Sequence, residues 1–391
     1  MNGSHQNLLR GITWNHTRGY LPMVATAQRF HELHPEVRIE WSVRSLQAFA
    51  DESLARLADS FDLLVIDHPS IGAAAENGLI LPLDEMLDRD FLEDQEKHSV
   101  GASYRSYSHN GSQWALAIDA AAPVSGWRPD LLAGAGARVP KTWEELMELA
   151  RRGLVAVPGL AIDSLMHLYM LCDAVGEEPF QQRGRLVSPE VGVKALQHLR
   201  ELMGLCDPAC MERNPIRTWE LLASSDRVAY CPFAYGYSNY SRSGFASNLI
   251  EVGDLPAFDC ETPLRSVLGG AGLAISSRCG RREIAAGYAQ FVAGEVCQRT
   301  LYFNAGGQPG HRSAWVDAET NRLANGFFLN TLETLDRALL RPRFNGYLEL
   351  QDAASERVHR YLLRGEPEIE VLAELDAILL AAQCKQAEGM P

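Results

Sequence analysis

The chain has 391 residues and a mass of 43.2 kDa, a length that corresponds to two or three domains or to one large two-lobed unit. Apolar residues make up 46% and charged residues 22% of the sequence, as in a soluble globular protein rather than a disordered one. The formal net charge is −14. This acidity argues against nucleic acid or an anionic membrane surface as the main partner, because both are bound through basic faces.

Strand and helix patterns alternate through the first third of the chain. Short apolar runs predict strands at 11–14, 37–41 and 62–67. Apolar residues three and four positions apart predict helices at 20–34, 46–57 and 73–77, the last of them closed by Gly78. This order predicts an α/β fold with a largely parallel sheet.

The rest of the chain is richer in helices. Helices are predicted at 142–152, 164–175, 189–204 and 282–304, and from Asp317 to the C-terminus. Thr142 and Glu145 have the spacing of a capping box at the start of the first of these helices. Further strands are expected at 114–119 and 268–276. Because no repeat or low-complexity linker separates these segments, two lobes would be joined by short crossings.

The eight cysteines form no CxxC motif and no paired cluster. Cys206 and Cys210 are close in sequence but have no second ligand pair nearby, so we expect reduced thiols rather than zinc or disulfides. No apolar run approaches the roughly 20 residues that span a bilayer. The polar residues 1–10 lack the pattern of a secretory signal.

Catalytic spacings are missing from the sequence. There is no Walker loop, and the glycines at 134–136 and 269–272 lack the third glycine of a dinucleotide fingerprint. His31 and His34 are three positions apart and precede Pro35, so they do not form an HExxH zinc motif. The sequence therefore predicts a protein that is not an enzyme and that has no cofactor and no bound metal.

Polar and aromatic side chains collect where the predicted strands end. These are Trp14, Asn15, His16, Arg18, Trp41, Arg44, Asp67, His68 and Asp119. In open α/β sheets, ligands bind at the carboxyl ends of the strands. Aromatic faces stack on sugar rings, carboxylates accept from hydroxyls and arginine donates in a fork, so this set predicts a site for a polyol.

Several of these residues also have a structural interpretation. Trp41 fits the core or a partly covered surface, Asp67 fits the cap of the next helix, and Arg18 fits a side chain that runs along the first helix into solvent. The aromatic stretch 230–240 would supply the opposite wall of the site, or is a well-packed strand and turn. These alternatives stay open at this point.

Longer motifs carry a family resemblance. They are Ile-Thr-Trp-Asn-His-Thr-Arg-Gly-Tyr at 12–20, Phe-Asp-Leu-Leu-Val-Ile-Asp at 61–67, Glu-Asn-Gly-Leu-Ile-Leu-Pro-Leu-Asp at 76–84, Arg-Pro-Asp-Leu-Leu at 128–132, Pro-Lys-Thr-Trp-Glu-Glu-Leu at 140–146, Leu-Gly-Gly-Ala-Gly-Leu at 268–273 and Gly-Gly-Gln-Pro at 306–309. Over nearly its whole length the chain resembles the extracellular solute-binding proteins of bacterial ABC importers, in the carbohydrate branch that includes maltose-binding protein.

The resemblance implies a two-lobed periplasmic-binding-protein type II fold that closes like a hinge on a ligand in the cleft between its lobes. The implied lobes are 1–120 plus 266–313 and 121–265 plus 314–391, with crossing strands near 119–123, 259–266 and 312–316. The implied ligand contacts come from Asn15, His16, Arg18, Asp67, His68, Asp119, Phe233, Tyr235 and Tyr237. Gly270 and Gln308, in the return to the first lobe, complete the candidate set with Trp14, Trp41 and Arg44.

The implied function is capture of a small polar solute, a sugar or sugar acid, for an ABC importer. Permease subunits are the implied partners, and we expect a monomer. His16, Arg18 and His68 give the site a cationic character that would suit an acidic sugar. The family is periplasmic or attached to the cell envelope, whereas the missing signal leaves a cytoplasmic location open. The alternatives are a cytosolic ligand sensor that has lost export and an α/β enzyme of unidentified reaction.

Overall fold

The computed structural model describes residues 7–46, 49, 53–258 and 262–388. Contacts between residues divide the chain into two compact units. Unit 1 comprises Met1–Ala121, Leu268–Arg322 and Arg343–Asn345, and unit 2 comprises Ala122–Val267, Leu323–Pro342 and Gly346–Pro391. Both contain strands and helices, so the predicted α/β class is confirmed. Among the described helices, none has the length and apolar character that crossing a membrane requires.

Unit 1 is built on a five-stranded sheet of order β2-β1-β3-β10-β6. Its strands are β1 (Asn7–Trp14), β2 (Val37–Arg44), β3 (Leu63–Ile66), β6 (Leu116–Ala121) and β10 (Gly269–Ile275), and a small hairpin is formed by β4 (Ser108–His109) and β5 (Ser112–Gln113). β1 runs parallel to β2 and β3, whereas β10 runs antiparallel to β3 and β6. The other strands therefore share one direction, and the prediction of a largely parallel sheet is confirmed.

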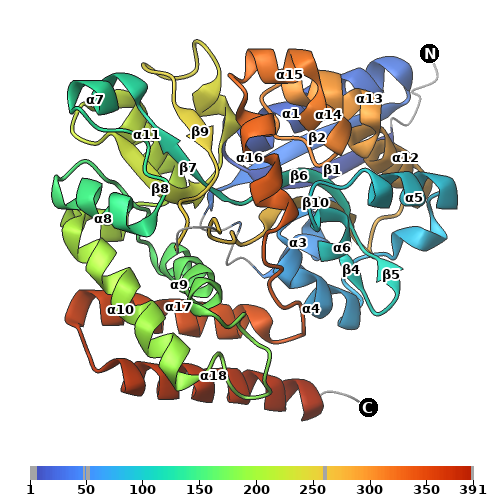
Figure 1. Cartoon of the computed structure of the whole chain (residues 1–391). Helices are drawn as coiled ribbons and strands as arrows, with labels where there is room; N and C mark the ends of the chain where they lie inside the picture. Colours follow the sequence, from blue (N-terminus) through green and yellow to red (C-terminus); the bar gives the residue numbers. More distant parts are fainter. Residues whose placement is uncertain (1–6, 47–48, 50–52, 259–261, 389–391) are drawn as a thin grey trace. The chain divides into compact units, whose positions relative to one another are not determined.

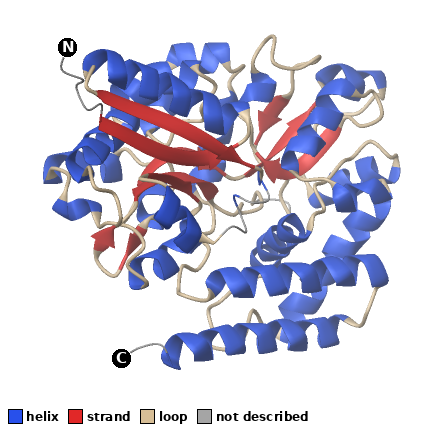
Figure 2. Ribbon diagram, turned by 180° about the vertical axis from the view of Figure 1, so that it is seen from behind, coloured by secondary structure: helices blue, strands red, loops and turns tan. Residues whose placement is uncertain are grey.

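The helices of unit 1 cover both faces of this sheet (Figure 2). They are α1 (Thr17–Leu33), α3 (Leu54–Ser60), α4 (Ile71–Glu76), α5 (Arg89–Lys97), α6 (Ser103–Ser106), α12 (Arg282–Ala293), α13 (Glu295–Cys297), α14 (Arg312–Val316) and α15 (Ala318–Leu323), which reaches the boundary with unit 2. Successive residues of β3 point to opposite faces. Leu63 and Val65 pack in the cluster that contains Met23, while Leu64 and Ile66 pack in the cluster that contains Ile71.

Three predicted elements differ from the structure. The predicted helix at 46–57 lies partly outside the described residues, and the described helix is α3. The predicted helix at 282–304 breaks at Gly294, which has extended backbone angles, and continues as α13 and a π-turn at Gln298–Tyr302. Residues 312–316, expected as a crossing strand, form α14, and the boundary between the units falls later, at Arg322. Trp315 donates to the carbonyl of Pro309 at 2.7 Å, and this bond holds α14 on unit 1.

Unit 2 combines a small antiparallel sheet, of order β8-β7-β9, with most of the long helices. The strands are β7 (Pro123–Trp127), β8 (Tyr230–Tyr235) and β9 (Glu251–Gly253), and the helices are α7 (Pro129–Gly134), α8 (Trp143–Arg151), α9 (Ala161–Val175), α10 (Pro189–Leu205), α11 (Pro215–Ser224), α16 (Phe327–Asp336), α17 (Tyr347–Arg364) and α18 (Glu368–Glu388). α9 is apolar and buried on all sides, so it forms the centre of the core of this unit.

The last helices explain the charged C-terminal sequence. α17 and α18 lie side by side (Figure 1). Arg357 of α17 is 2% exposed, and its guanidinium donates to Glu374 of α18 at 2.5 Å and to Glu366 at 2.8 Å. Charge alternation in this segment therefore includes an interhelical ion pair between the buried Arg357 and the half-exposed Glu374, as well as solvent-facing residues.

Replacing Thr142 with alanine tests the predicted capping box, which is present at the start of α8. The Thr142 hydroxyl accepts from the Glu145 N–H at 3.3 Å, and Glu145 accepts in return from the Thr142 N–H at 3.3 Å. Thr142→Ala should lower the free energy of unfolding in urea by about 1 kcal/mol, because a helix-end amide loses its partner. The control Thr300→Ala removes an exposed hydroxyl and should cost about 0.5 kcal/mol or less. Equal costs for the two variants would contradict this account.

Candidate functional site

The carboxyl edge of the unit 1 sheet gathers the candidate residues that follow its strands. Trp14 and Arg44 end β1 and β2 opposite each other in the register. Asp67 follows the last residue of β3. Gly270 of β10 pairs with Ala120, next to Asp119 of β6. Residues of five strands thus meet at one edge, where ligands bind in open α/β sheets.

A buried ion pair joins two elements of this edge. Arg18 lies in the first turn of α1, directly after β1, and is 4% exposed. Its Nε donates to Asp119 Oδ2 at 2.8 Å, and its second nitrogen contacts Oδ1 of the same carboxylate. Burial raises the pKa of Asp119, while the Arg18 guanidinium acts to lower it. The alternative in which Arg18 runs into solvent is therefore wrong, because two nitrogens of its guanidinium contact the Asp119 carboxylate.

His16 and Asn15 connect β1 to α1. His16 is the N-cap of α1, where its Nδ1 accepts from the Arg18 backbone N–H at 3.0 Å. Burial, together with the positive charge of Arg18, lowers the pKa of His16 to about 4. The ring is therefore neutral at pH 7. Asn15 is exposed, and its backbone N–H donates to the carbonyl of Arg44 at 2.7 Å.

The two tryptophans of this edge differ in how their indole nitrogens are satisfied. Trp14 is 4% exposed and packs against Gly19 and the ring of Phe49, 5.2 Å away between centroids. Its Nε1 is buried and has no hydrogen-bond partner in the structure's described part. Trp41 is half-buried, and its Nε1 donates to the hydroxyl of Tyr288 at 3.3 Å. Trp14 thus keeps an unused donor, whereas Trp41 is satisfied by the protein.

Asp67, His68 and Arg44 form hydrogen bonds and ion pairs within the sheet edge of unit 1. The Asp67 carboxylate accepts from the His68 N–H at 2.8 Å and caps the short 3₁₀ turn at His68–Ser70, as its structural interpretation predicted. His68 is fully buried, and its Nδ1 lies 3.1 Å from Asp67 Oδ1. Arg44 is 8% exposed and donates to the Val65 carbonyl at 3.0 Å.

Gly270 and Gln308 hold the end of β6. Gly270 has a φ of 109°, and a Cβ there would lie 2.3 Å from the carbonyl oxygen of Asp119. The Gln308 side-chain amide is buried and donates to the carbonyl of Ala120 at 2.8 Å. Both residues therefore position the backbone that carries Asp119.

In unit 2, the aromatic stretch forms β8 and a following 3₁₀ turn at Ser238–Ser241, so the strand-and-turn interpretation describes its backbone. Phe233 is 1% exposed and packs 4.5 Å from the ring of His167, inside the core of this unit. Tyr237 is also buried, while Tyr235 is half-buried and accepts at its carbonyl from Trp219 at 2.8 Å. Of the predicted aromatic wall, Tyr235 keeps the largest accessible surface.

Sequence reasoning missed a buried acid and imidazole in α9. Asp163 and His167 are one helical turn apart and are 4% and 2% exposed. Asp163 Oδ2 and His167 Nδ1 have no hydrogen-bond partner among the described residues. Burial raises the pKa of Asp163 to about 8 and lowers the pKa of His167 to about 3. Burying such groups without partners costs stability, which points to a ligand role. The sequence signal that could have revealed them is an aspartate and a histidine four positions apart in an otherwise apolar helix.

The cysteines take no part in these arrangements. Every cysteine in the described part of the chain is free, and all of them except Cys384 are buried. Burial raises the pKa of Cys206 to about 12 and that of Cys210 to about 11, which leaves both thiols protonated at neutral pH. Within the same described residues, one group of three side chains has metal-ligating atoms close together, and it consists of Asp94, His98 and His311.

Residues 13–168 match the family model of bacterial extracellular solute-binding proteins. The predicted resemblance to this family is confirmed over these residues. No curated protein matches the chain. The matched family is one of solute-binding proteins, which agrees with the prediction that the chain is not an enzyme.

Solved structures of solute-binding proteins share the fold over at least 95% of this chain. Maltose-bound MalE3 of T. maritima has 20% identity and a TM-score of 0.80, over 95% of this chain and 98% of that one. A solute-binding protein of Agrobacterium radiobacter K84 in complex with ribitol has 20% identity and a TM-score of 0.80, over 96% and 98%. UgpB of Mycobacterium tuberculosis in complex with glycerophosphocholine has 16% identity and a TM-score of 0.77, over 97% and 99%. The predicted two-lobed fold is therefore confirmed.

Removing either partner of the Arg18–Asp119 pair should destabilise unit 1 strongly. Arg18→Ala or Asp119→Ala leaves a buried charge without its partner, at a cost of about 3–5 kcal/mol, and the double variant should cost less than the sum of the two. Urea unfolding measures all three. The control is Arg29→Ala, which breaks an exposed pair with Glu32 and should cost about 1 kcal/mol or less. A cost for Arg18→Ala as small as that of the control would contradict a structural role for the pair.

Asp163→Asn should stabilise the protein in a pH-dependent way. The folded-state pKa of about 8 lies above the ordinary value of 3.8, so protonated Asp163 contributes stability at low pH that is lost as pH rises toward 8. Relative to wild type, the variant should gain at most about 1.4 kcal/mol per pH unit between pH 4 and pH 8. Thermal unfolding across that range measures the gain, with the exposed Asp88→Asn as control. A difference that does not change with pH would show that Asp163 ionises normally.

Proposed function

We propose that this chain is the solute-binding protein of a bacterial ABC importer and that it captures a small polyhydroxylated solute, a sugar or a polyol. The observation that carries the proposal is the set of buried polar atoms without hydrogen-bond partners among the described residues, namely Trp14 Nε1 in unit 1 and Asp163 Oδ2 and His167 Nδ1 in unit 2. Leaving such atoms unpaired is costly. Hydroxyl groups both donate and accept, so a hydroxyl-rich solute can satisfy unpaired atoms of either kind in the unit that it contacts.

The electrostatics of the unit 1 edge favour a neutral solute over a sugar acid. The sequence suggested a cationic site because of His16, Arg18 and His68. In the structure, Arg18 is paired with Asp119, His16 is neutral at pH 7, and His68 lies beside the Asp67 carboxylate. A solute carboxylate would therefore meet these three groups already paired or uncharged and would lose hydration on burial, although Arg44, which donates to the neutral Val65 carbonyl, also lies at this edge.

The ligands of the related structures point the same way. The T. maritima protein is bound to maltose and the Agrobacterium protein to ribitol, both neutral and rich in hydroxyls. The M. tuberculosis protein holds glycerophosphocholine, which carries one charge of each sign. By analogy with this family, we propose permease subunits as partners and the periplasm or cell envelope as location. Hinge closure on the ligand, the monomeric state and a cleft that joins the candidate residues of both units stay predictions.

A thermal-shift screen over neutral sugars, polyols and uronic acids tests the proposal. A solute that binds only the native state raises the free energy of unfolding by mass action, and the unfolding midpoint rises with it. At a free solute concentration of a hundred times the Kd, the gain is about 2.7 kcal/mol. At least one neutral sugar or polyol should raise the midpoint. Failure of every neutral solute in a broad panel, with a shift from a different chemical class, would overturn the proposed solute class.

Trp14→Phe should weaken binding of the solute found in that screen by about tenfold, or about 1.4 kcal/mol. The ring remains for packing, but the donor that would reach a solute hydroxyl is lost. Trp41→Phe is the matched control, because its indole nitrogen already donates to Tyr288 and should not be needed by the solute. Isothermal titration measures both. Equal affinities for wild type and Trp14→Phe would remove Trp14 from the site.

A further inference from the structure

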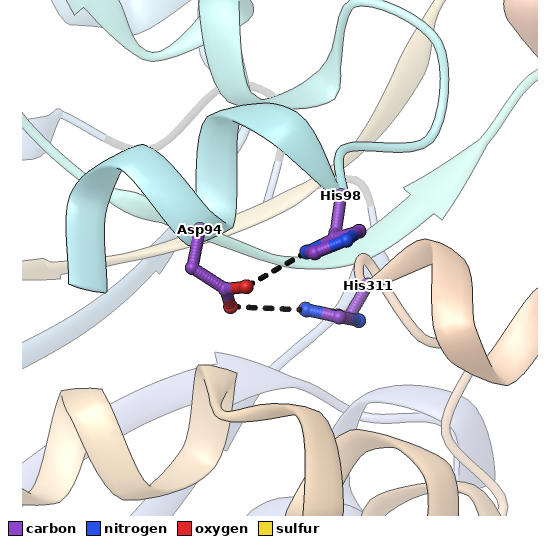
Figure 3. Close-up of side chains that lie close together, drawn as sticks. All are labelled: Asp94, His98 and His311. Atoms are coloured by element: carbon purple, nitrogen blue, oxygen red, sulfur yellow. Dashed lines mark hydrogen bonds and ion pairs between the residues drawn. The ribbon is translucent and has the colours of Figure 1, made fainter. Parts of the chain in front are cut away.

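Two distant segments of unit 1 bring two histidines and an aspartate together. Asp94 lies on α5 and His98 caps its C-terminal end, while His311 is the N-cap of α14. Asp94 Oδ1 lies 2.7 Å from His98 Nδ1, and Asp94 Oδ2 lies 3.5 Å from His311 Nε2. Figure 3 shows the Asp94 carboxylate facing both rings, with one oxygen toward each. One ligating atom from each residue lies within 4.8 Å of the others.

Backbone contacts fix this arrangement independently of the three side chains. Ser99 and His311 form an isolated antiparallel bridge. The backbone N–H of Arg312 donates to the carbonyl of His98 at 2.7 Å, and its Nε donates to the carbonyl of Ser99 at 3.0 Å. The segments that carry the three groups are therefore held side by side by the fold, so little of the binding free energy of an ion would be spent on ordering them.

We propose that Asp94, His98 and His311 bind a divalent transition-metal ion, with Zn²⁺ as the best fit. Two imidazole nitrogens, one carboxylate oxygen and a water make a four-coordinate site of the kind that zinc prefers. Zinc–ligand bonds of ~2.0–2.2 Å at tetrahedral angles place ligand atoms ~3.3 Å apart. The observed separations of 2.7 and 3.5 Å run to different oxygens of the Asp94 carboxylate. Side-chain rotations would therefore have to bring the three ligating atoms, which lie within 4.8 Å of one another, to that spacing.

The surroundings of His311 suit a metal ligand. Its Nδ1 lies 2.8 Å from the hydroxyl of Ser313. The Nδ1 atom also accepts from the Ser313 backbone N–H at 3.3 Å as the N-cap of α14, so the ring is held with Nε2 facing the Asp94 carboxylate. The carboxylate of Glu295 adds negative potential near this ring.

The three side chains are exposed enough for an ion to reach them from solvent. His311 is nearly buried at 2%, whereas the side chains of Asp94 and His98 are 44% and 38% exposed. An ion can therefore enter from solvent and keep a water as its fourth ligand. Once bound, it would fasten α5 to α14, which lie far apart in the sequence. No metal was predicted from the sequence, which lacks the usual zinc motifs and separates Asp94 from His311 by 217 positions.

Isothermal titration of Zn²⁺ into the chelator-treated full chain tests this site. A Cys384→Ser background removes the exposed thiol, which could bind zinc by itself. We expect one saturable site, a higher unfolding midpoint with Zn²⁺, and visible absorption from Co²⁺ in four-coordinate geometry. Asp94→Asn and His98→Ala should each weaken Zn²⁺ binding at least tenfold. The control His109→Ala alters another histidine–carboxylate pair, with Glu76 at 3.2 Å, and should change the Kd less than twofold.

Two results would overturn the proposal. One is the absence of saturable Zn²⁺ binding to the Cys384→Ser chain, and the other is unchanged affinity in both Asp94→Asn and His98→Ala. These two residues carry the test because they are partly exposed, whereas His311 also caps α14 and its replacement could disturb folding. Circular dichroism verifies that each variant is folded. The test needs no solute, so its outcome is independent of the proposed transport function.

Discussion

The Arg18–Asp119 ion pair is the interaction on which the candidate site depends. Both side chains are almost completely buried, and the guanidinium meets both oxygens of the carboxylate. A buried charge is tolerated only when it is paired and hydrogen-bonded, so each partner requires the other. The pair ties the first turn of α1 to the end of β6. Gly270 and Gln308 then hold the β6 backbone in the position that the pair needs.

This pairing also determines the electrostatic character of the sheet edge. An arginine that pointed outward would make the edge a carboxylate receptor, because its fork matches that geometry. Here the fork is filled by Asp119, and His16 is neutral as the N-cap of α1. A solute at this edge would meet hydrogen-bonding groups together with the Arg44 guanidinium, which donates to the neutral carbonyl of Val65. At this edge, Trp14 keeps a buried N–H without a hydrogen-bond partner among the described residues, and a solute hydroxyl can accept from it.

Local patterns predicted much of the fold. The apolar run at 62–67 gave β3, and the Thr142–Glu145 spacing gave the cap of α8. The gathering of residues at strand ends followed from the rule that parallel strands end at one edge. The pairing of Arg18 with Asp119 did not follow, because the two residues are 101 positions apart and each one also suits a ligand. Asp163 was missed because helix starts are uncertain by a few residues, and the expected start excluded it. The Asp94, His98 and His311 cluster joins segments that only the folded chain brings together.

The charge preference of the site is the most direct test of this account. Isothermal titration of the wild-type protein with a neutral sugar and with its uronic acid, each at low and high salt, compares solutes that differ only in a carboxylate. The account predicts that the neutral sugar binds at least tenfold more tightly, about 1.4 kcal/mol, with a Kd that does not change with salt. Tighter binding of the uronic acid, weakened by salt, would show an unpaired cation at the site and would contradict the role assigned to the Arg18–Asp119 pair.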